Sequence, residues 1–307
     1  MCGMIFFMTG ASGFLGNAVL KELLKSELTE KIYCLIHKKK PKVRDSRISY
    51  IYGGLEGLAD ITVSEKIDVC AVLSGLINGQ GIESKEIMEV NYDGVKTVID
   101  FCKKNNIEYL AMVSSVNVLL KKKEAYARSK ELAEKAVRES GLKYFIFRPA
   151  LIYGYQCTQG IKVIEHFIEH LNVVPIFGNG RKLEQPIHVE ECAAYITYYL
   201  LNAYRNNGRV IELYGMNALS YNELCRTIGR VMHKKVKLLH IPVLPIILCL
   251  KILEFLHLPF PVSVEQIYHV DSDLSGDMSS ICKETGIKGK FFEENYRRDF
   301  EKERLYR

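Results

Sequence analysis

Short apolar runs alternate with amphipathic stretches through the first half of the chain. The runs are nearly continuous and rich in branched and aromatic residues: MIFFM (4–8), KIYCLI (31–36), RISYIYG (47–53), DVCAVLSG (68–75), YLAMVSS (109–115) and KYFIFRP (143–149). Strands have this composition when helices cover both of their faces, as in a parallel sheet. We therefore expect parallel strands at these positions.

Helical patterns lie between the runs, over residues 14–26, 84–105 and 125–140. Repeated strand–helix units with right-handed crossovers predict an α/β fold, a doubly wound parallel sheet of the Rossmann type. After Arg148-Pro149 the alternation weakens, and glycine and proline interrupt the pattern. We expect one domain over residues 1–150. Residues 151–307 should mainly form a smaller C-terminal substrate-binding lobe that shares some elements with the first domain, and residues 294–307 a solvated terminal helix.

Composition narrows the class of protein. The 307 residues are 48% hydrophobic and 25% charged, with a formal net charge of +6, which suits an anionic small ligand but does not indicate nucleic acid. The nine cysteines form no CxxC pair and mostly lie in apolar runs. Buried, reduced thiols of a cytoplasmic protein have this pattern, which argues against a disulfide framework and against a metal site.

One later segment, IPVLPIILCLKILEFLHLPFPV (241–262), is strongly apolar but carries Lys251, Glu254 and four prolines. Its longest uncharged part is shorter than the roughly 20 residues that a membrane span needs. We expect a buried or groove-lining helix here, with loose association with a lipid surface as the alternative. No transmembrane segment and no signal peptide are expected.

The stretch MTGASGFLG (8–16) follows the first predicted strand and opens the first predicted helix. Gly10, Gly13 and Gly16 permit a tight turn and a close approach of the backbone to a ligand. Free N–H groups at the start of a helix stabilise a pyrophosphate. This predicts a dinucleotide site in residues 1–150; an ordinary glycine turn is the alternative.

The second predicted strand indicates which dinucleotide binds. In NAD sites an acidic residue at the end of this strand binds the ribose 2′-hydroxyl. Here the strand is followed by His37-Lys38-Lys39-Lys40-Pro41, without an acid. The basic residues favour NADP(H) and leave NAD(H) possible, with His37 and Lys38 nearest to the 2′-phosphate. The alternative is a solvated lysine loop.

Candidate chemistry follows the fifth predicted strand. Ser114 and Ser115 end it, and Tyr126 and Lys130 lie one turn apart on one face of the next helix. A lysine ammonium lowers the pKa of a nearby phenol, and a serine hydroxyl can polarise a carbonyl. This set suits hydride transfer between a nicotinamide and an alcohol or ketone.

These motifs, together with FRPALIYG (147–154), VNYDGVKTVIDFC (90–102), GNGRKLEQPIHVEECA (178–193) and DMSSICKETGIK (277–288), resemble the short-chain dehydrogenase/reductase superfamily. More narrowly, they resemble its extended branch, the NAD(P)-dependent epimerase/dehydratase family, which acts largely on nucleotide sugars. The similarity covers nearly the whole chain.

The resemblance implies roles for particular residues. Ser115 would polarise the substrate oxygen, Tyr126 would pass the proton, and Lys130 would also bind the nicotinamide ribose. The expected cofactor-binding residues are Gly10, Ser12, Gly13, Phe14, Leu15 and Gly16 for the pyrophosphate, Leu55, Ser74, Gly75 and Asn91 for the adenine and ribose side, and Pro149, Ala150 and Ile152 for the nicotinamide end. The expected substrate contacts are Gln185, Pro186 and His188.

Some residues depart from the family pattern or have a structural alternative. Gly54 stands where the family has an acid that binds adenine, and Val116-Asn117 replaces the acid pair of a 4,6-dehydratase. His188 could instead be a structural group and Arg148 a partner within the sheet edge. The loop residues Arg181-Lys182 could face a substrate diphosphate or water.

The resulting hypothesis is an NADP(H)-dependent 4-ketoreductase or 4-epimerase whose partner is a small molecule, a nucleotide sugar. One alternative is reduction of a lipid- or steroid-like ketone, with the apolar 241–262 segment over the pocket. Another is a non-catalytic NADP(H) sensor, although a sensor has no need of Ser115, Tyr126 and Lys130 together. By analogy with the family, the helices that end in FCKKN and AVRES could form a homodimer face.

Overall fold

The computed structural model describes residues 3–77, 82–242 and 273–305. Its centre is a seven-stranded sheet with the order β11-β6-β5-β4-β1-β2-β3, in which every neighbouring pair is parallel. The strands are β1 (Met4–Thr9), β2 (Thr29–Ile36), β3 (Ile48–Tyr52), β4 (Val69–Val72), β5 (Tyr109–Val113), β6 (Lys143–Pro149) and β11 (Arg209–Leu213). The six expected strands and the doubly wound parallel sheet are confirmed.

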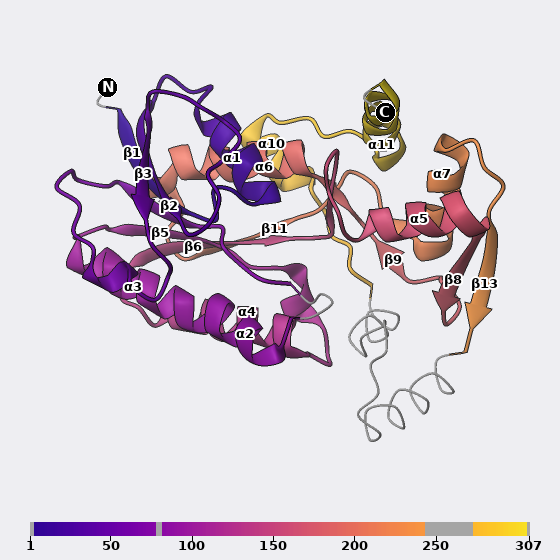
Figure 1. Cartoon of the computed structure of the whole chain (residues 1–307), viewed down its shortest axis with the longest axis horizontal. Coiled ribbons are helices and arrows are strands. Elements are labelled where there is room, and N and C mark those ends of the chain that lie inside the picture. The colour runs from indigo at the N-terminus through magenta and orange to yellow at the C-terminus, as the bar shows by residue number, and fades with distance from the viewer. Residues whose placement is uncertain (1–2, 78–81, 243–272, 306–307) are drawn as a thin grey trace.

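Helices cover both faces of this sheet (Figure 1). One face carries α1 (Phe14–Leu23), α6 (Val189–Leu201) and α10 (Ser279–Thr285). The other carries α2 (Ser84–Met88), α3 (Gly94–Lys104) and α4 (Ala125–Arg138). Short 3-10 turns lie at η1 (Leu58–Asp60), η3 (Val116–Leu119) and η4 (Ala203–Arg205).

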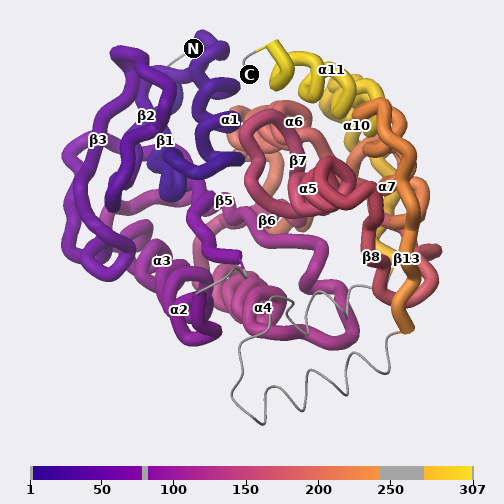
Figure 2. The backbone as a smooth tube through the Cα atoms, turned by 45° about the vertical axis from the view of Figure 1, so that its right-hand side comes forward, coloured from indigo at the N-terminus to yellow at the C-terminus, as the bar shows by residue number. Residues whose placement is uncertain are grey.

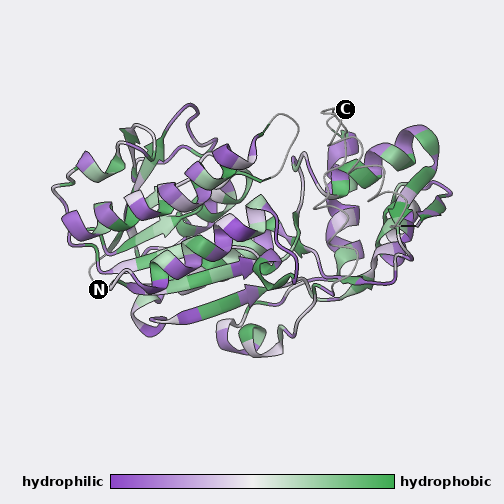
Figure 3. Cartoon of the chain, turned by 90° about the horizontal axis from the view of Figure 1, so that it is seen from below, coloured by the Kyte–Doolittle hydropathy of each residue, from purple (hydrophilic) through white to green (hydrophobic). Residues whose placement is uncertain are grey.

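The two-sided cover explains the continuous apolar runs. Along β1, Phe6 and Met8 belong to the apolar cluster on one face of the sheet, whereas Phe7 belongs to the cluster on the other. Phe7 packs against Phe101 of α3, with ring centroids 4.5 Å apart. Apolar residues fill the strands between the helices, whose outer faces are mostly polar (Figure 3). A strand buried on both faces cannot alternate polar and apolar residues.

A smaller lobe lies beside the central sheet (Figure 2). It contains α5 (Ile161–Leu171), β8 (Val173–Phe177), α7 (Tyr221–Val231), β13 (Lys237–Ile241) and α11 (Phe292–Leu305), with the short strands β7 (Ile152–Tyr153), β9 (Leu183–Glu184), β10 (Ile187–His188) and β12 (Leu219–Ser220). A third apolar cluster joins α5, β8, α7 and α11. Strand β11 and helix α6 follow residue 150 in the sequence, yet β11 belongs to the central sheet and α6 covers one of its faces. The domain division at residue 150 stays a prediction.

Two expectations about helices were wrong in detail. The helix expected over 84–105 is interrupted by η2 (Glu89–Asp93), one turn of π-helix. The terminal helix is not simply solvated: Phe292 and Tyr296 of α11 are 1% and 4% exposed and pack in the third cluster. Because charged residues dominate the sequence of this helix, the pattern did not indicate that two aromatic residues one turn apart form a buried face.

In the described ranges, no helix is long and apolar enough to cross a membrane. The helix expected over 241–262 lies outside the described residues, apart from Ile241 and Pro242.

A buried ion cluster fixes α4 against the sheet. Arg148 of β6 donates two hydrogen bonds to Glu134 of α4, from Nε (2.9 Å) and Nη2 (2.8 Å), and Arg138 adds a third at 2.9 Å. Arg148 also pairs with Glu212 of β11 at 3.2 Å, so the structural alternative for Arg148 is confirmed. Burial would raise the pKa of Glu134, but the two guanidinium groups outweigh it and hold the pKa below its ordinary value.

We expect Glu134→Gln to lower the free energy of unfolding by about 3 kcal/mol, because it removes the buried counter-charge of the Arg148 guanidinium and leaves only the longer pair with the more exposed Glu212. Urea unfolding followed by circular dichroism measures this change. Glu139→Gln on the same helix is the matched control. Its partner Lys135 lies 3.9 Å away on the exposed surface, so the change should stay below about 0.5 kcal/mol. Equal effects of the two variants would contradict the expectation.

Candidate active site

The candidate site residues gather at the carboxyl edge of the sheet, in the segments that follow the strands. Residues 10–16 follow β1, His37 and Lys38 follow β2, and Leu55 follows β3. Ser74 and Gly75 follow β4, Ser115 follows β5, and the segment 149–152 ends β6 and begins β7. Ligands of open α/β sheets bind at this edge, where the strand order reverses. Here the reversal lies between β1 and β4.

The loop after β1 needs glycine for steric reasons. Gly10 has a φ of +71°, and a Cβ added there would lie 2.4 Å from the backbone nitrogen of Ser74. A Cβ at Gly16 would lie 2.0 Å from the carbonyl oxygen of Gly10. The first turn of α1 therefore packs directly on the loop, which no other residue type at these two positions permits.

Three backbone donors at the start of α1 remain available. Gly13 donates to the Gly10 carbonyl at 2.9 Å, and Asn17 donates to the Gly13 carbonyl at 2.9 Å. In the described part of the chain, the N–H groups of residues 14–16 have no hydrogen-bond partner. Free N–H groups at a helix start, beside an open glycine loop, fit a pyrophosphate.

The basic segment after β2 lies next to this loop, because β1 and β2 are parallel neighbours. Lys40 folds back over the rings of Tyr50 and Tyr52, with Nζ 4.8 and 5.6 Å from their centroids. His37 and Lys38 are exposed, and within the described ranges neither has a hydrogen bond or ion pair. Both of the side chains nearest to the strand end are thus available to a ligand.

Lys130 is almost fully buried on α4. Its Nζ donates to the carbonyl oxygen of Val113, the last residue of β5, at 3.0 Å. Burial lowers the pKa of Lys130 to about 8, although the charge of Glu134 opposes this change. A Cβ at Gly75 would lie 2.9 Å from Nζ, so the loop after β4 also borders this lysine.

Ser115 and Tyr126 lie beside Lys130 in the fold. Ser115 caps η3, where its Oγ accepts a hydrogen bond from the N–H of Asn117 at 3.2 Å, and it is 7% exposed. Tyr126 is half-buried in the first turn of α4, one turn before Lys130. Because η3 packs against α4, the serine and the tyrosine–lysine face belong to one end of the sheet.

Asn91 connects the segment after β4 to helix α4. It is fully buried in the π-turn, donates to and accepts from the backbone of Leu76 at 2.8 Å, and donates to Ser129 Oγ at 3.1 Å. Ser129 in turn donates to the carbonyl of Tyr126 at 2.8 Å. The extra residue of a π-turn often marks a functional position. The family resemblance predicts Asn91 as a site residue, whereas no periodicity rule predicts the π-turn that holds it.

Glu56 is a further candidate for the acid that binds adenine, which the sequence pattern places at residue 54. A Cβ added to Gly54 would lie 2.2 Å from both carboxylate oxygens of Glu56. The carboxylate of Glu56 therefore fills the space where an acid at residue 54 would begin. Leu55 packs on Gly94, where an added Cβ would lie 2.6 Å from its Cδ1.

The residues expected to contact the substrate are buried and contact other parts of the protein. Gln185 is buried, donates to the carbonyls of Gly215 (2.6 Å) and Gly276 (3.1 Å), and accepts from the N–H of Gly276 (3.0 Å). Pro186 is buried beside it, and its carbonyl would lie 2.0 Å from a Cβ at Gly215. These contacts account for the polar atoms of the Gln185 side chain, and a substrate contact of either residue stays a prediction.

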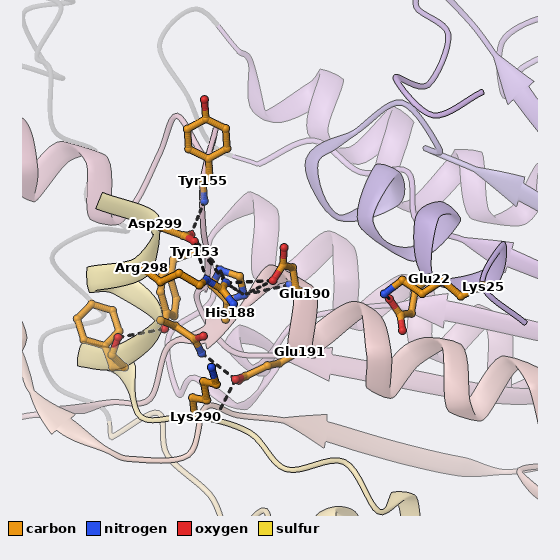
Figure 4. Close-up of polar contacts among 12 residues, drawn as sticks. Glu22, Lys25, Tyr153, Tyr155, His188, Glu190, Glu191, Lys290, Arg298 and Asp299 are labelled. Atoms are coloured by element: carbon orange, nitrogen blue, oxygen red, sulfur yellow. Dashed lines mark hydrogen bonds and ion pairs between the residues drawn. The ribbon is translucent and has the colours of Figure 1, made fainter. Parts of the chain in front are cut away.

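The side chain of His188, like that of Gln185, makes its polar contacts within the protein (Figure 4). It caps α6, where Nδ1 accepts from the N–H of Glu190 at 3.2 Å, and its Nε2 lies 2.9 Å from Oδ2 of Asp299 on α11. Burial would raise the pKa of Asp299, but the hydrogen bond from His188 and the charge of Arg298 hold it below its ordinary value. The geometry agrees with the structural alternative, in which His188 joins α6 to α11.

Three further charged positions lie in the segment before His188. Lys182 faces Asp273 at 3.9 Å, and Arg181 is exposed. Glu184 of β9 has a pKa that burial raises to about 7. Its carboxyl group has no hydrogen bond or ion pair to any described residue. Sequence reasoning passed over Glu184 because an acid next to Lys182 looks like an ordinary surface residue.

Known proteins resemble this chain in sequence and in fold. The model of the NAD dependent epimerase/dehydratase family matches residues 6–213. A ceramide reductase from Caulobacter vibrioides is 24% identical over 76% of this chain and 73% of its own. A 3 beta-hydroxysteroid dehydrogenase/Delta 5-->4-isomerase from Vaccinia virus (strain Ankara) is 25% identical over 54% of this chain and 56% of its own. The solved structure of a UDP-N-acetylglucosamine 4-epimerase from Methanobrevibacter ruminantium, in complex with UDP-N-acetylmuramic acid, superposes with a TM-score of 0.74, covers all of both chains and is 18% identical.

The loop geometry predicts that alanine substitutions at Gly16 and Gly13 affect different properties of the protein. Gly16→Ala should destabilise the protein by about 3 kcal/mol, because its Cβ would overlap the Gly10 carbonyl. Gly13→Ala should change stability by less than about 1 kcal/mol, because its φ of −71° suits any residue and its nearest contact is 3.2 Å. The Gly13 variant should instead weaken dinucleotide binding, since the methyl group would point into the open loop.

Urea unfolding and fluorescence titration with NADPH separate these two effects. Loss of stability in Gly13→Ala, or undiminished stability in Gly16→Ala, would contradict the described loop.

Proposed function

The chain belongs to the NAD dependent epimerase/dehydratase family, and we propose that it is an NADP(H)-dependent enzyme that interconverts a carbonyl and a secondary alcohol. The observation that carries this proposal is the buried Lys130 on the same helical face as Tyr126, at the carboxyl edge of the sheet. A buried ammonium one turn from a phenol lowers the pKa of that phenol and makes it a usable acid and base near neutral pH.

The proposed roles follow from these positions. Ser115 donates a hydrogen bond to the reacting oxygen of the substrate, and Tyr126 gives that oxygen a proton or removes one. Lys130, fixed by the Val113 carbonyl, stabilises the phenolate of Tyr126. The bound dinucleotide supplies or accepts the hydride. Residues 10–16 would hold its pyrophosphate, and Asn91, Gly75 and Lys130 would lie along the riboses.

The preference for NADP(H) is supported by charge. His37 and Lys38 follow β2 directly and are not engaged by other described residues. No acid follows β2 to accept a hydrogen bond from a 2′-hydroxyl. Positive charge at this position stabilises a 2′-phosphate.

For the substrate we favour an uncharged lipid- or steroid-like ketone. The curated relatives with sequence similarity bear the names ceramide reductase and 3 beta-hydroxysteroid dehydrogenase/Delta 5-->4-isomerase. The carboxyl of Glu184 stands next to Gln185 in the segment expected to line the pocket, and it has a pKa of about 7. Burial favours the neutral form of this carboxyl, which suits an uncharged ligand.

A nucleotide sugar is the second candidate, with a 4-ketoreductase or 4-epimerase reaction. The specific observation in its favour is the fold shared over the full chain with a 4-epimerase that holds a UDP-sugar derivative. The exposed Arg181 could then face the diphosphate.

We expect Tyr126→Phe to reduce turnover by about a hundred-fold or more, because the general acid and base is removed. The NADPH affinity should change by less than about threefold, since the phenyl ring keeps its packing. Turnover is measured from NADPH oxidation with a ketone substrate, and affinity from NADPH fluorescence. Tyr204→Phe, at a position that is 61% exposed, is the matched control and should leave both quantities unchanged.

The pH profile gives a second readout of the same assignment. Lys130 loses its proton as the pH rises through about 8, so kcat/KM for reduction should fall across that range. Lys130→Met, which has no charge to lose, should show a low rate without this fall. Full activity of Tyr126→Phe would sink the proposed chemistry.

The substrate class is decided by what the enzyme turns over and retains. We expect NADPH oxidation with a ketosteroid or a long-chain keto-amide, and native mass spectrometry of freshly purified protein should show bound NADP(H). A UDP-4-keto-sugar should give little or no turnover, because a pocket suited to an uncharged ligand would desolvate the diphosphate without pairing its charge. Turnover of the UDP-sugar alone, or a retained nucleotide sugar, would overturn the lipid-like substrate in favour of the second candidate.

A further inference from the structure

One side chain connects the two expected phosphate sites. Asn17, in the first turn of α1, donates from Nδ2 to the carbonyl oxygens of Ser12 (2.8 Å) and Gly13 (2.9 Å). Its Oδ1 accepts a hydrogen bond from the backbone N–H of Lys42 at 2.7 Å. Both donors of the amide are thus used on the glycine loop, and its acceptor is used on the segment that carries His37 and Lys38.

The first pair of bonds orients the glycine loop. A carbonyl oxygen that faced the ligand would repel an anionic phosphate, whereas an N–H group attracts it. Asn17 holds the carbonyls of Ser12 and Gly13 on its own side, which is the side away from the free N–H groups of residues 14–16. The pyrophosphate site is therefore shaped by this amide without direct contact.

The third bond fixes the basic segment relative to that site. Residues 37–42 leave β2 as an exposed connection, and Pro41 is its one buried residue. The bond from Lys42 N–H to Asn17 ties the far end of this connection to α1. The side chain of Lys42 points elsewhere, to the side-chain oxygen of Gln156.

We propose that Asn17 is a positioning residue for NADP(H): by holding the backbone at Lys42, it sets His37 and Lys38 at a defined place relative to the pyrophosphate loop, and so determines the preference for a 2′-phosphorylated dinucleotide. This inference rests on the proposed NADP(H) dependence. NADPH would use both sites that Asn17 connects, whereas NADH would use only the pyrophosphate loop. Loss of the connection should therefore weaken NADPH binding more than NADH binding.

The test is equilibrium binding of NADPH and NADH to the full chain, followed by nicotinamide fluorescence. Asn17→Leu keeps the size of the side chain and removes all three hydrogen bonds. We expect the Kd for NADPH to rise about thirtyfold and the Kd for NADH about threefold, a tenfold loss of preference that corresponds to about 1.4 kcal/mol. Asn17→Ser, whose shorter hydroxyl cannot reach both partners, should show the same trend and replaces the leucine variant if that variant does not fold.

Lys42→Ala is the matched control. It removes the ammonium group but keeps the backbone N–H that Asn17 accepts, so the NADPH/NADH preference should change by less than about threefold. Equal weakening of NADPH and NADH in both Asn17 variants would overturn the inference, because it would indicate a role in the glycine loop alone. A tenfold loss of preference in Lys42→Ala would also overturn it, because the lysine charge would then be the determinant.

The wild-type protein separates failure of this inference from failure of the proposed function. If wild-type protein binds NADH as tightly as NADPH, the proposed cofactor preference is wrong and the inference falls with it. If wild-type protein prefers NADPH and the Asn17 variants keep that preference, only the inference is wrong. Because binding is measured without turnover, a defect in hydride chemistry affects neither result.

Discussion

The candidate chemistry depends on keeping one ammonium group out of water. Lys130 is 4% exposed, yet its Nζ retains only the Val113 carbonyl as a hydrogen-bond acceptor within the described ranges. Burial of a lysine lowers its pKa, and a value of about 8 leaves the group charged at neutral pH but close to titration. The carboxylate of Glu134, one turn further along α4, moderates this cost. Two arginines compensate the carboxylate in turn, so these charges form a chain from α4 to the sheet.

The parallel sheet determines where the chemistry collects. Because all neighbouring strands of the sheet are parallel, every strand ends at the same edge, and the loop that follows each strand begins there. Residues from the segments after β1 to β6 therefore meet although they are spread over more than a hundred positions of sequence. Contacts such as those of Gly75 with Lys130 and of Asn91 with Ser129 join separate units of this sheet into one site.

The sequence was sufficient for the sheet and for the motifs that follow its strands. Continuous apolar runs identified six strands, and β11 escaped because its run, RVIEL (209–213), is short and carries charge at an edge of the sheet. The roles of Asn17, Glu56 and Asn91 depend on which backbone atoms lie within reach, and residue spacing does not contain that information. Likewise, the aromatic residues of α11 could not be assigned to a core from a helix dominated by charges. Residue type alone could not decide between a substrate contact and a structural role for Gln185 and His188, whose polar atoms the structure shows bonded within the protein.

The C-terminal lobe shows why a shared fold does not by itself establish a shared substrate. A likeness at 18% identity reproduces the path of the backbone, whereas binding of a diphosphate depends on the sign of a few charges. In the segment before β10 this chain has a cation exposed at Arg181, a cation paired at Lys182, and a desolvated carboxyl at Glu184. A carboxyl with a pKa near 7 is readily protonated at neutral pH, and both an apolar ligand and a neighbouring anion would favour its neutral form. Whether the lobe accepts a diphosphate therefore depends on the charge state and position of these few side chains, which the shared path of the backbone does not determine.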